Sequence, residues 1–154
     1  MTQRPTIAVV HPYWTFWEHT AGPTFRADRL ALARYVAAQN DDRFEPTLVA
    51  DVASIEDGVA LGGRLREQPP DALLVLMSMA VPPAYLTAAL DQLPRLPLVI
   101  WAIHETGLVG GDFDHGGITT QGATVGAPML TNVLSRQGRP FELVLGRVDD
   151  CLLY

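Results

Sequence analysis

The residues best suited to chemistry follow short apolar runs of the chain. His11, Ser78 and the adjacent pair His104 and Glu105 each come directly after such a run. A histidine beside a carboxylate can act as an acid–base pair or as a pair of hydrogen-bonding groups. Open parallel sheets bind ligands at the carboxyl edge of their strands, so we expect these side chains to line a binding crevice. The alternative is that His104 and Glu105 simply begin a loop.

Aromatic residues are concentrated just after His11, where Tyr13, Trp14, Phe16 and Trp17 are followed by the polar Glu18 and His19. Aromatic faces with polar neighbours suit the apolar face and the hydroxyl groups of a sugar. The same rings could instead cover the edge of the sheet or form a subunit contact. The sequence leaves these three interpretations open.

The glycine-rich segment GGDFDHGGITTQG is the third candidate. Asp112, Asp114 and His115, together with the other histidines, are ligands that a divalent metal accepts, but their spacing matches no metal motif. Gln121 precedes a predicted helix, whose N-terminus favours anions. A nucleotide site is the weaker alternative, because neither the dinucleotide fingerprint nor a Walker loop is present. We therefore predict no metal site and no cofactor on this chain.

Ser78, in a different segment, lacks the Gly-x-Ser-x-Gly turn that holds the nucleophile of many hydrolases.

Composition excludes several classes of partner. The net charge is −6 and the 11 Lys and Arg residues form no basic run, so nucleic acid is not expected to bind. Cys151 is the only cysteine, which rules out an internal disulfide and a clustered cysteine zinc site. The apolar stretch before His11 is too short for a signal peptide or a membrane span. We expect a cytoplasmic protein that does not bind membranes.

Five short runs are apolar on both faces, which is typical of strands in a parallel sheet with helices on both sides. They are Ile7–Val10, Thr47–Val49, Leu73–Met77, Leu98–Ile103 and Phe141–Leu145. Because helical stretches alternate with these strands, the sequence predicts a single α/β domain over residues 1–154. The predicted fold is a flavodoxin-like three-layer sandwich with the strand order 2-1-3-4-5. The 154 residues are a usual size for one domain.

The predicted helices have recognisable starts and ends. In Thr24–Ala38 the apolar residues share one face, and we expect Arg26, Arg29 and Arg34 to face solvent. Ser54 and Asp57 resemble a capping box.

Glycine and proline mark the limits of the remaining helices. Gly58, Gly62 and Gly63 weaken the prediction of the helix after Ser54, whereas Pro82 and Pro83 suit a helix start. In the last helix, Thr124–Gln137, Pro128 is tolerable only in the first turn, and Gly138 is placed to end the helix.

Four blocks of the chain carry a resemblance to a known family. They are AVVHPYWTFWEHTAGPTFRADR, LMSMAVPPAY, VIWAIHETG and HGGITTQGATVGAPMLTNVLSRQGRPFELVLGRVDD. Together they resemble the N-terminal domain of the L-arabinose and L-fucose isomerase family over nearly the whole chain. The last block is the most specific, with its glycine-rich turn, its helix containing Asn132 and Leu134, and its strand ending in Gly-Arg.

The resemblance implies aldose–ketose isomerisation with a divalent metal, usually Mn²⁺, whose ligands the family places in middle and C-terminal domains that are absent from this chain. The N-terminal domain is implied to pack in a homo-oligomer, or against neighbouring catalytic domains, and to lend its loops to the mouth of the active site. His104 and Glu105 stand where arabinose isomerases have Thr-Gln, so the sugar is not defined. The substrate-binding residues expected from the sequence and the resemblance are His11, Trp14, Trp17, His19, Ser78, Val81, His104, Glu105 and Gln121.

The leading interpretation is therefore a domain for substrate recognition and assembly in an arabinose/fucose-type isomerase, with no catalytic residue of its own and no turnover by this chain alone. The alternative is a stand-alone module that binds a sugar or sugar phosphate without catalysis. A third interpretation is a purely structural oligomerisation domain.

Overall fold

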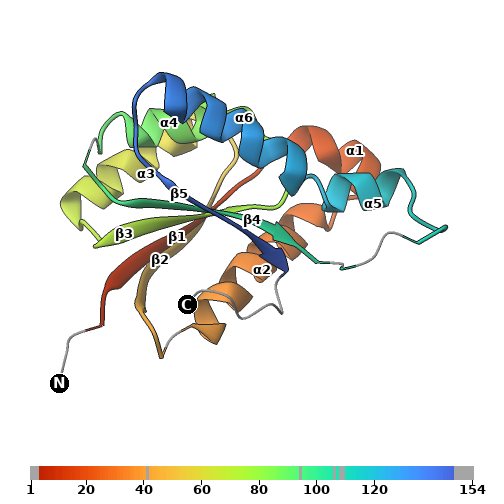
Figure 1. Ribbon diagram of the computed structural model, residues 1–154, viewed down its shortest axis with the longest axis horizontal. Helices are drawn as coiled ribbons and strands as arrows, with labels where there is room; N and C mark the ends of the chain where they lie inside the picture. The colour runs from red at the N-terminus through yellow and green to blue at the C-terminus, as the bar shows by residue number, and fades with distance from the viewer. Residues whose placement is uncertain (1–3, 41, 94, 106, 108–109, 148–154) are drawn as a thin grey trace.

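The computed structural model describes residues 4–40, 42–93, 95–105, 107 and 110–147. Its centre is a parallel sheet of five strands in the order β2-β1-β3-β4-β5, as predicted (Figure 1). The strands are β1 (Thr6–Pro12), β2 (Glu45–Val52), β3 (Ala72–Met77), β4 (Leu98–His104) and β5 (Glu142–Arg147). The predicted fold class, a flavodoxin-like α/β sandwich, is confirmed.

Helices form the two outer layers. One face of the sheet is covered by α2 (Phe25–Gln39), and the other by α3 (Ile55–Glu67), α4 (Ala84–Leu90) and α6 (Ala123–Arg136), as Figure 1 shows. Each face has its own apolar core, because successive residues of a strand point to opposite faces. On β4, for example, Ile100 packs in the core beneath α4 and α6, whereas Trp101 packs in the core beside α2. Within the described residues, no helix is both long and apolar enough to cross a bilayer.

The loops after β1 and β4 contain short helices. The loop after β1 forms η1 (Thr15–Trp17) and α1 (Glu18–Ala21), and the loop after β4 forms α5 (His115–Thr120). Both loops therefore have local backbone hydrogen bonding of their own. Contacts between α1 and α5 join them above the carboxyl edge of the sheet.

The predicted helix ends are largely correct. The hydroxyl of Ser54 accepts a hydrogen bond from the backbone N–H of Asp57 at 3.0 Å and so caps α3. Gly138, with φ of +68°, ends α6 in the left-handed conformation that glycine adopts most readily. Pro128 differs from the prediction, because α6 starts at Ala123 and the proline lies beyond its first turn. Its ring lies at an exposed position of the helix, so the carbonyl it leaves unpaired can bond water.

Two glycines that seemed unfavourable for α3 allow it to approach α4 closely. A Cβ on Gly58 would lie 2.0 Å from the carbonyl oxygen of Tyr85, and one on Gly62 would clash with the side chain of Gln92. Gly63, in the same helix, has nothing within 4 Å of its Cβ position. Gly58 is therefore required by packing against the backbone of α4. At Gly62 the main clash is with the end of a flexible side chain, which can move, and Gly63 is not constrained by packing.

These contacts predict opposite effects for two alanine substitutions in α3. Gly58→Ala should lower the free energy of unfolding by about 1–3 kcal/mol, because the backbone of α4 must move. Gly63→Ala should raise it by up to about 1 kcal/mol, because alanine is the better helix former. Urea unfolding of both variants checks this, and an equal effect of the two substitutions would contradict the packing argument.

Candidate functional site

The expected polar residues do gather at the carboxyl edge of the sheet. His11 lies near the end of β1, Ser78 directly follows β3, and His104 is the last residue of β4. These three strands are neighbours and run parallel, so their ends lie side by side. The prediction that the ends of these strands meet at one edge is confirmed.

His11 and Ser78 form a buried pair. The imidazole Nε2 of His11 lies 2.8 Å from the Ser78 Oγ, and the two residues are 0% and 1% exposed. The other ring nitrogen, Nδ1, has no hydrogen-bond partner among the described residues. Burial, and in second place the charge of Arg29, lowers the pKa of His11 to about 3. The imidazole is thus neutral at physiological pH and joins β1 to β3 beneath the surface.

Arg29 is the residue that the sequence interpretation misplaced. It was expected in solvent, but it is 5% exposed and lies on the buried side of α2. Its Nη1 donates a hydrogen bond to the Oε1 of Glu105, and its guanidinium lies 5.2 Å from the ring centroid of Phe25. The spacing of Phe25, Arg29 and Val36, four and then seven residues apart, places all three on one helical face and could have revealed this.

His104 and Glu105 serve opposite faces of the sheet. Glu105 points toward α2 and pairs with Arg29, whereas the Nδ1 of His104 lies 3.3 Å from the Oε1 of Gln121, the residue that ends α5. The side chain of Glu105 is 36% exposed, and both His104 and Gln121 are partly exposed. Two separate polar groups therefore flank the end of β4.

The aromatic loop covers the edge above the buried pair. Tyr13 is fully buried and packs with Phe25, Met79 and Val81. The indole N–H of Trp17 donates to the carbonyl of Ala80 at 2.7 Å, which ties the loop to the segment after β3. The structure thus supports the covering role that the sequence left as one of three possibilities.

Part of the aromatic cluster nevertheless faces solvent. The rings of Trp14 and Phe16 stack with centroids 4.7 Å apart, and Phe16 is 52% exposed. His19, by contrast, is exposed on α1.

Burial of the Tyr13 hydroxyl, and its hydrogen bond to Glu18, raise the pKa of the phenol. Tyr13 is therefore a neutral, structural member of the cluster.

The candidate metal ligands do not come together. In the described part of the chain, no three histidine, cysteine or acidic side chains are grouped as a metal ion would require. Asp114 instead caps α5, since its Oδ1 accepts a hydrogen bond from the N–H of Gly117 at 2.9 Å. His115 is the exposed first residue of that helix.

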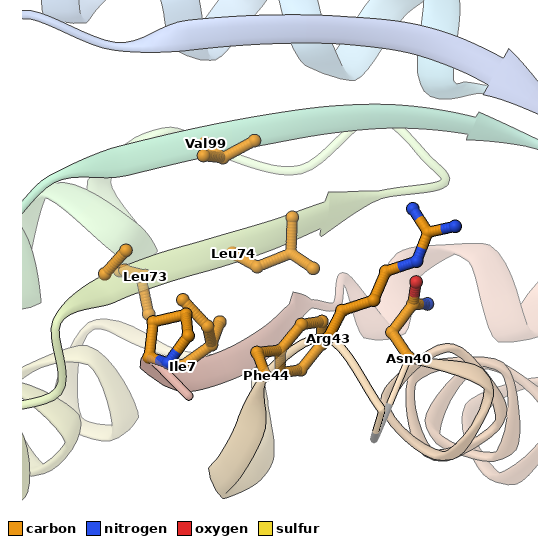
Figure 2. Close-up of a pocket in the computed structure, with 9 residues that line it drawn as sticks. Ile7, Asn40, Arg43, Phe44, Leu73, Leu74 and Val99 are labelled. Carbon is orange, nitrogen blue, oxygen red and sulfur yellow. The ribbon is translucent and has the colours of Figure 1, made fainter. Parts of the chain in front are cut away.

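An apolar cavity of about 220 Å³ lies elsewhere, at the amino end of the strands on the α2 side of the sheet. Figure 2 shows Ile7, Phe44, Leu74 and Val99 around it, with Arg43 and Asn40 at one side. It shares no residue with the polar groups described above. The cavity and the candidate site are therefore distinct parts of the molecule.

Comparison with known proteins gives information on the fold alone. No family model matches the chain, and no curated protein matches it. Among solved structures, a GDSL-like lipase from Bacteroides ovatus is similar with a TM-score of 0.51 at 11% identity, covering 96% of this chain and 47% of that protein. A LacI-family transcription repressor from Corynebacterium glutamicum aligns with a TM-score of 0.36 at 14% identity, over 96% of this chain and 56% of the repressor. The chain thus spans about half the length of each.

The buried imidazole gives a pH prediction. Unfolded His11 binds a proton below its ordinary pKa of 6.5, whereas folded His11 does so only near 3. Stability should therefore fall as the pH drops from 6.5 toward 3, and this residue should contribute about 2 kcal/mol of loss between pH 7 and 5. Urea unfolding of the wild type and of His11→Gln at both pH values measures the difference.

A second readout does not depend on the variant. The ring carbon resonances of His11 should remain those of a neutral imidazole at pH 5. An imidazole that is protonated at pH 5 in the folded protein, or an equal pH dependence in wild type and variant, would contradict the buried neutral pair.

Proposed function

We propose that the carboxyl edge of the sheet binds a small neutral sugar, and that the chain is the domain for substrate recognition and assembly of an arabinose/fucose-type aldose–ketose isomerase. The observation that carries this proposal is the exposed carboxylate of Glu105, held in place by a buried arginine. A fixed acceptor of this kind is suited to the hydroxyl groups of a polyol, because its orientation is set before the ligand arrives.

The neighbouring groups support the same ligand class. His104 and Gln121 offer both donors and acceptors, and they are partly exposed on the other side of the end of β4. A hydroxyl group donates and accepts at once, so this mixture of groups suits it. The buried His11 and Ser78 do not reach solvent, and in this proposal they position the strand ends rather than contact the sugar.

The aromatic cluster supplies the apolar part of the proposed site. The exposed ring of Phe16, backed by Trp14, presents a face on which the C–H groups of a sugar can stack. Trp17 and Val81 are tied into the segment after β3 and support the cluster from below. The expected substrate-binding residues included Trp14 but not the more exposed Phe16.

The resemblance to the arabinose and fucose isomerases connects this edge to a biological role. In that family the N-terminal domain contributes loops to a site whose metal ligands lie in other domains. The loops after β1, β3 and β4 are the corresponding segments here. The proposed role of this chain is therefore to hold the sugar, with the metal chemistry supplied by neighbouring domains or subunits.

Titration with L-arabinose and L-fucose tests the binding site. Resonances of Trp14, His104, Glu105 and Gln121 should shift at millimolar sugar, since the proposed contacts are few and open to solvent. Glu105→Gln should weaken binding about tenfold, because the charged acceptor becomes a neutral amide and its ion pair with Arg29, which orients it, is lost. Glu67→Gln, at the exposed end of α3, is the matched control and should bind as the wild type. Unchanged resonances at the carboxyl edge would remove the basis of the proposal.

Catalysis gives a separate prediction. The purified chain with Mn²⁺ should not convert pentoses or 6-deoxyhexoses, because polarising the substrate oxygens requires a bound metal and its ligands belong to other domains in the resembling family. A discontinuous assay for ketose formation over long incubations measures this. Turnover by the chain alone would show that a metal site is completed within it.

A further inference from the structure

The two edges of the sheet differ in how well they are protected against pairing. On β2, Glu45, Pro46 and Thr47 are exposed, and the proline lacks an N–H to donate. The ladder between β2 and β1 also has a register shift next to Ile7. A charge, a proline and an irregular ladder are the features with which proteins keep an edge strand from adding another strand.

The β5 edge lacks the proline and the irregular ladder, and its one exposed charge, Glu142, lies at the first residue of the strand. Its sequence is ELVLGR, without proline or lysine, and its ladder with β4 is regular. Leu143 is 44% and Leu145 is 65% exposed, although both lie in a strand. Both leucines lie on the same face of the sheet as Ile100 and Ala102 of β4. On this face α6 covers β4 and β3. Among the described residues β5 pairs with β4 alone. The N–H and C=O groups on the outer side of β5 therefore form no hydrogen bonds with another described strand.

We propose that β5 is the contact through which two copies of this chain form an antiparallel, two-fold symmetric dimer. A two-fold axis perpendicular to the sheet pairs side chains that lie on the same face. When this axis passes beside Val144, Val144 of one copy lies directly opposite Val144 of the other. Leu143 then lies opposite Leu145 of the partner subunit, and Leu145 opposite Leu143 of the partner subunit. The four leucines form one apolar cluster on the α6 side of a continuous sheet of ten strands.

The register argues for a second copy rather than another partner. Of the symmetric registers, only the one centred on Val144 pairs all three apolar residues of β5 with apolar residues. An axis at Leu145 would place Leu143 against Arg147, and an axis at Leu143 would place Val144 against Glu142. In the chosen register Glu142 faces Gly146 of the partner subunit, so no like charges are opposed. The strand is thus self-complementary in one alignment.

Cysteine cross-linking tests the register. In a Cys151→Ser background, Val144→Cys places two thiols directly opposite each other, and a mild oxidant should join the copies. Leu143→Cys is the matched control, because residues 143 of the two copies are diagonal neighbours, roughly 7–8 Å apart. The control should cross-link at least about tenfold more slowly, since a disulfide needs closer Cβ atoms. Equal rates for the two variants would overturn the proposed register.

Light scattering with size-exclusion chromatography tests the dimer itself. The wild-type chain should have twice the monomer mass at high concentration, and Leu145→Lys should raise the dissociation constant at least about tenfold. Val59→Lys, at a position 53% exposed on α3, is the control and should leave the dimer unchanged. A wild type that stays monomeric, as it would if another segment or protein covered β5, overturns the proposal. A dimer insensitive to Leu145→Lys also overturns it.

The dimer is independent of the proposed sugar site. β5 is the edge strand next to β4 and contains none of the proposed sugar-binding residues. The substitution Glu105→Gln should therefore leave the dissociation constant of the dimer as in the wild type. Loss of sugar binding with an intact dimer would therefore count against the ligand site alone. Loss of the dimer with intact sugar binding would count against the β5 contact alone.

Discussion

The buried guanidinium of Arg29 is the constraint on which the carboxyl edge depends. A charge removed from water is costly unless an opposite charge and hydrogen bonds compensate for it. Glu105 supplies the charge and the ring of Phe25 supplies a polarisable face. Arg29 belongs to α2 and Glu105 follows β4, and the two residues are 76 positions apart in the chain. The pair therefore holds together a helix and a strand that are distant in sequence. The same positive charge helps to keep His11 neutral.

A neutral His11 in turn determines what the edge can do. As a neutral ring it can share a hydrogen bond with Ser78 in a site that excludes water, and so it links the ends of β1 and β3 without an ionic partner. The pair is thereby structural, whereas the polar side chains at the end of β4 are open to solvent. The polar residues of the edge thus divide into a buried layer that joins the strand ends and an outer layer that is exposed to solvent.

The sequence was sufficient for the fold because its signals were local. Apolar runs separated by helical stretches gave the strands, and Ser54 and Gly138 gave helix boundaries through their own backbone chemistry. The site was less predictable, since it depends on contacts between distant segments. Nothing near Arg29 in sequence shows that Glu105 will meet it, and the choice of partner for His11 was equally hidden. Gly58 and Gly62 of α3 were misjudged for the same reason, because their small size allows the close approach of α4.

The pairing of Arg29 with Glu105 also explains how a carboxylate is accommodated at the end of β4. A glutamate without a partner at this position would place a charge beside a buried edge. Here the carboxylate meets a guanidinium that would otherwise be unpaired, so the two residues require each other. Glu105, directly after β4, and Arg29 in α2 therefore form one structural unit. A ligand that uses the free side of Glu105 would be recognised through both.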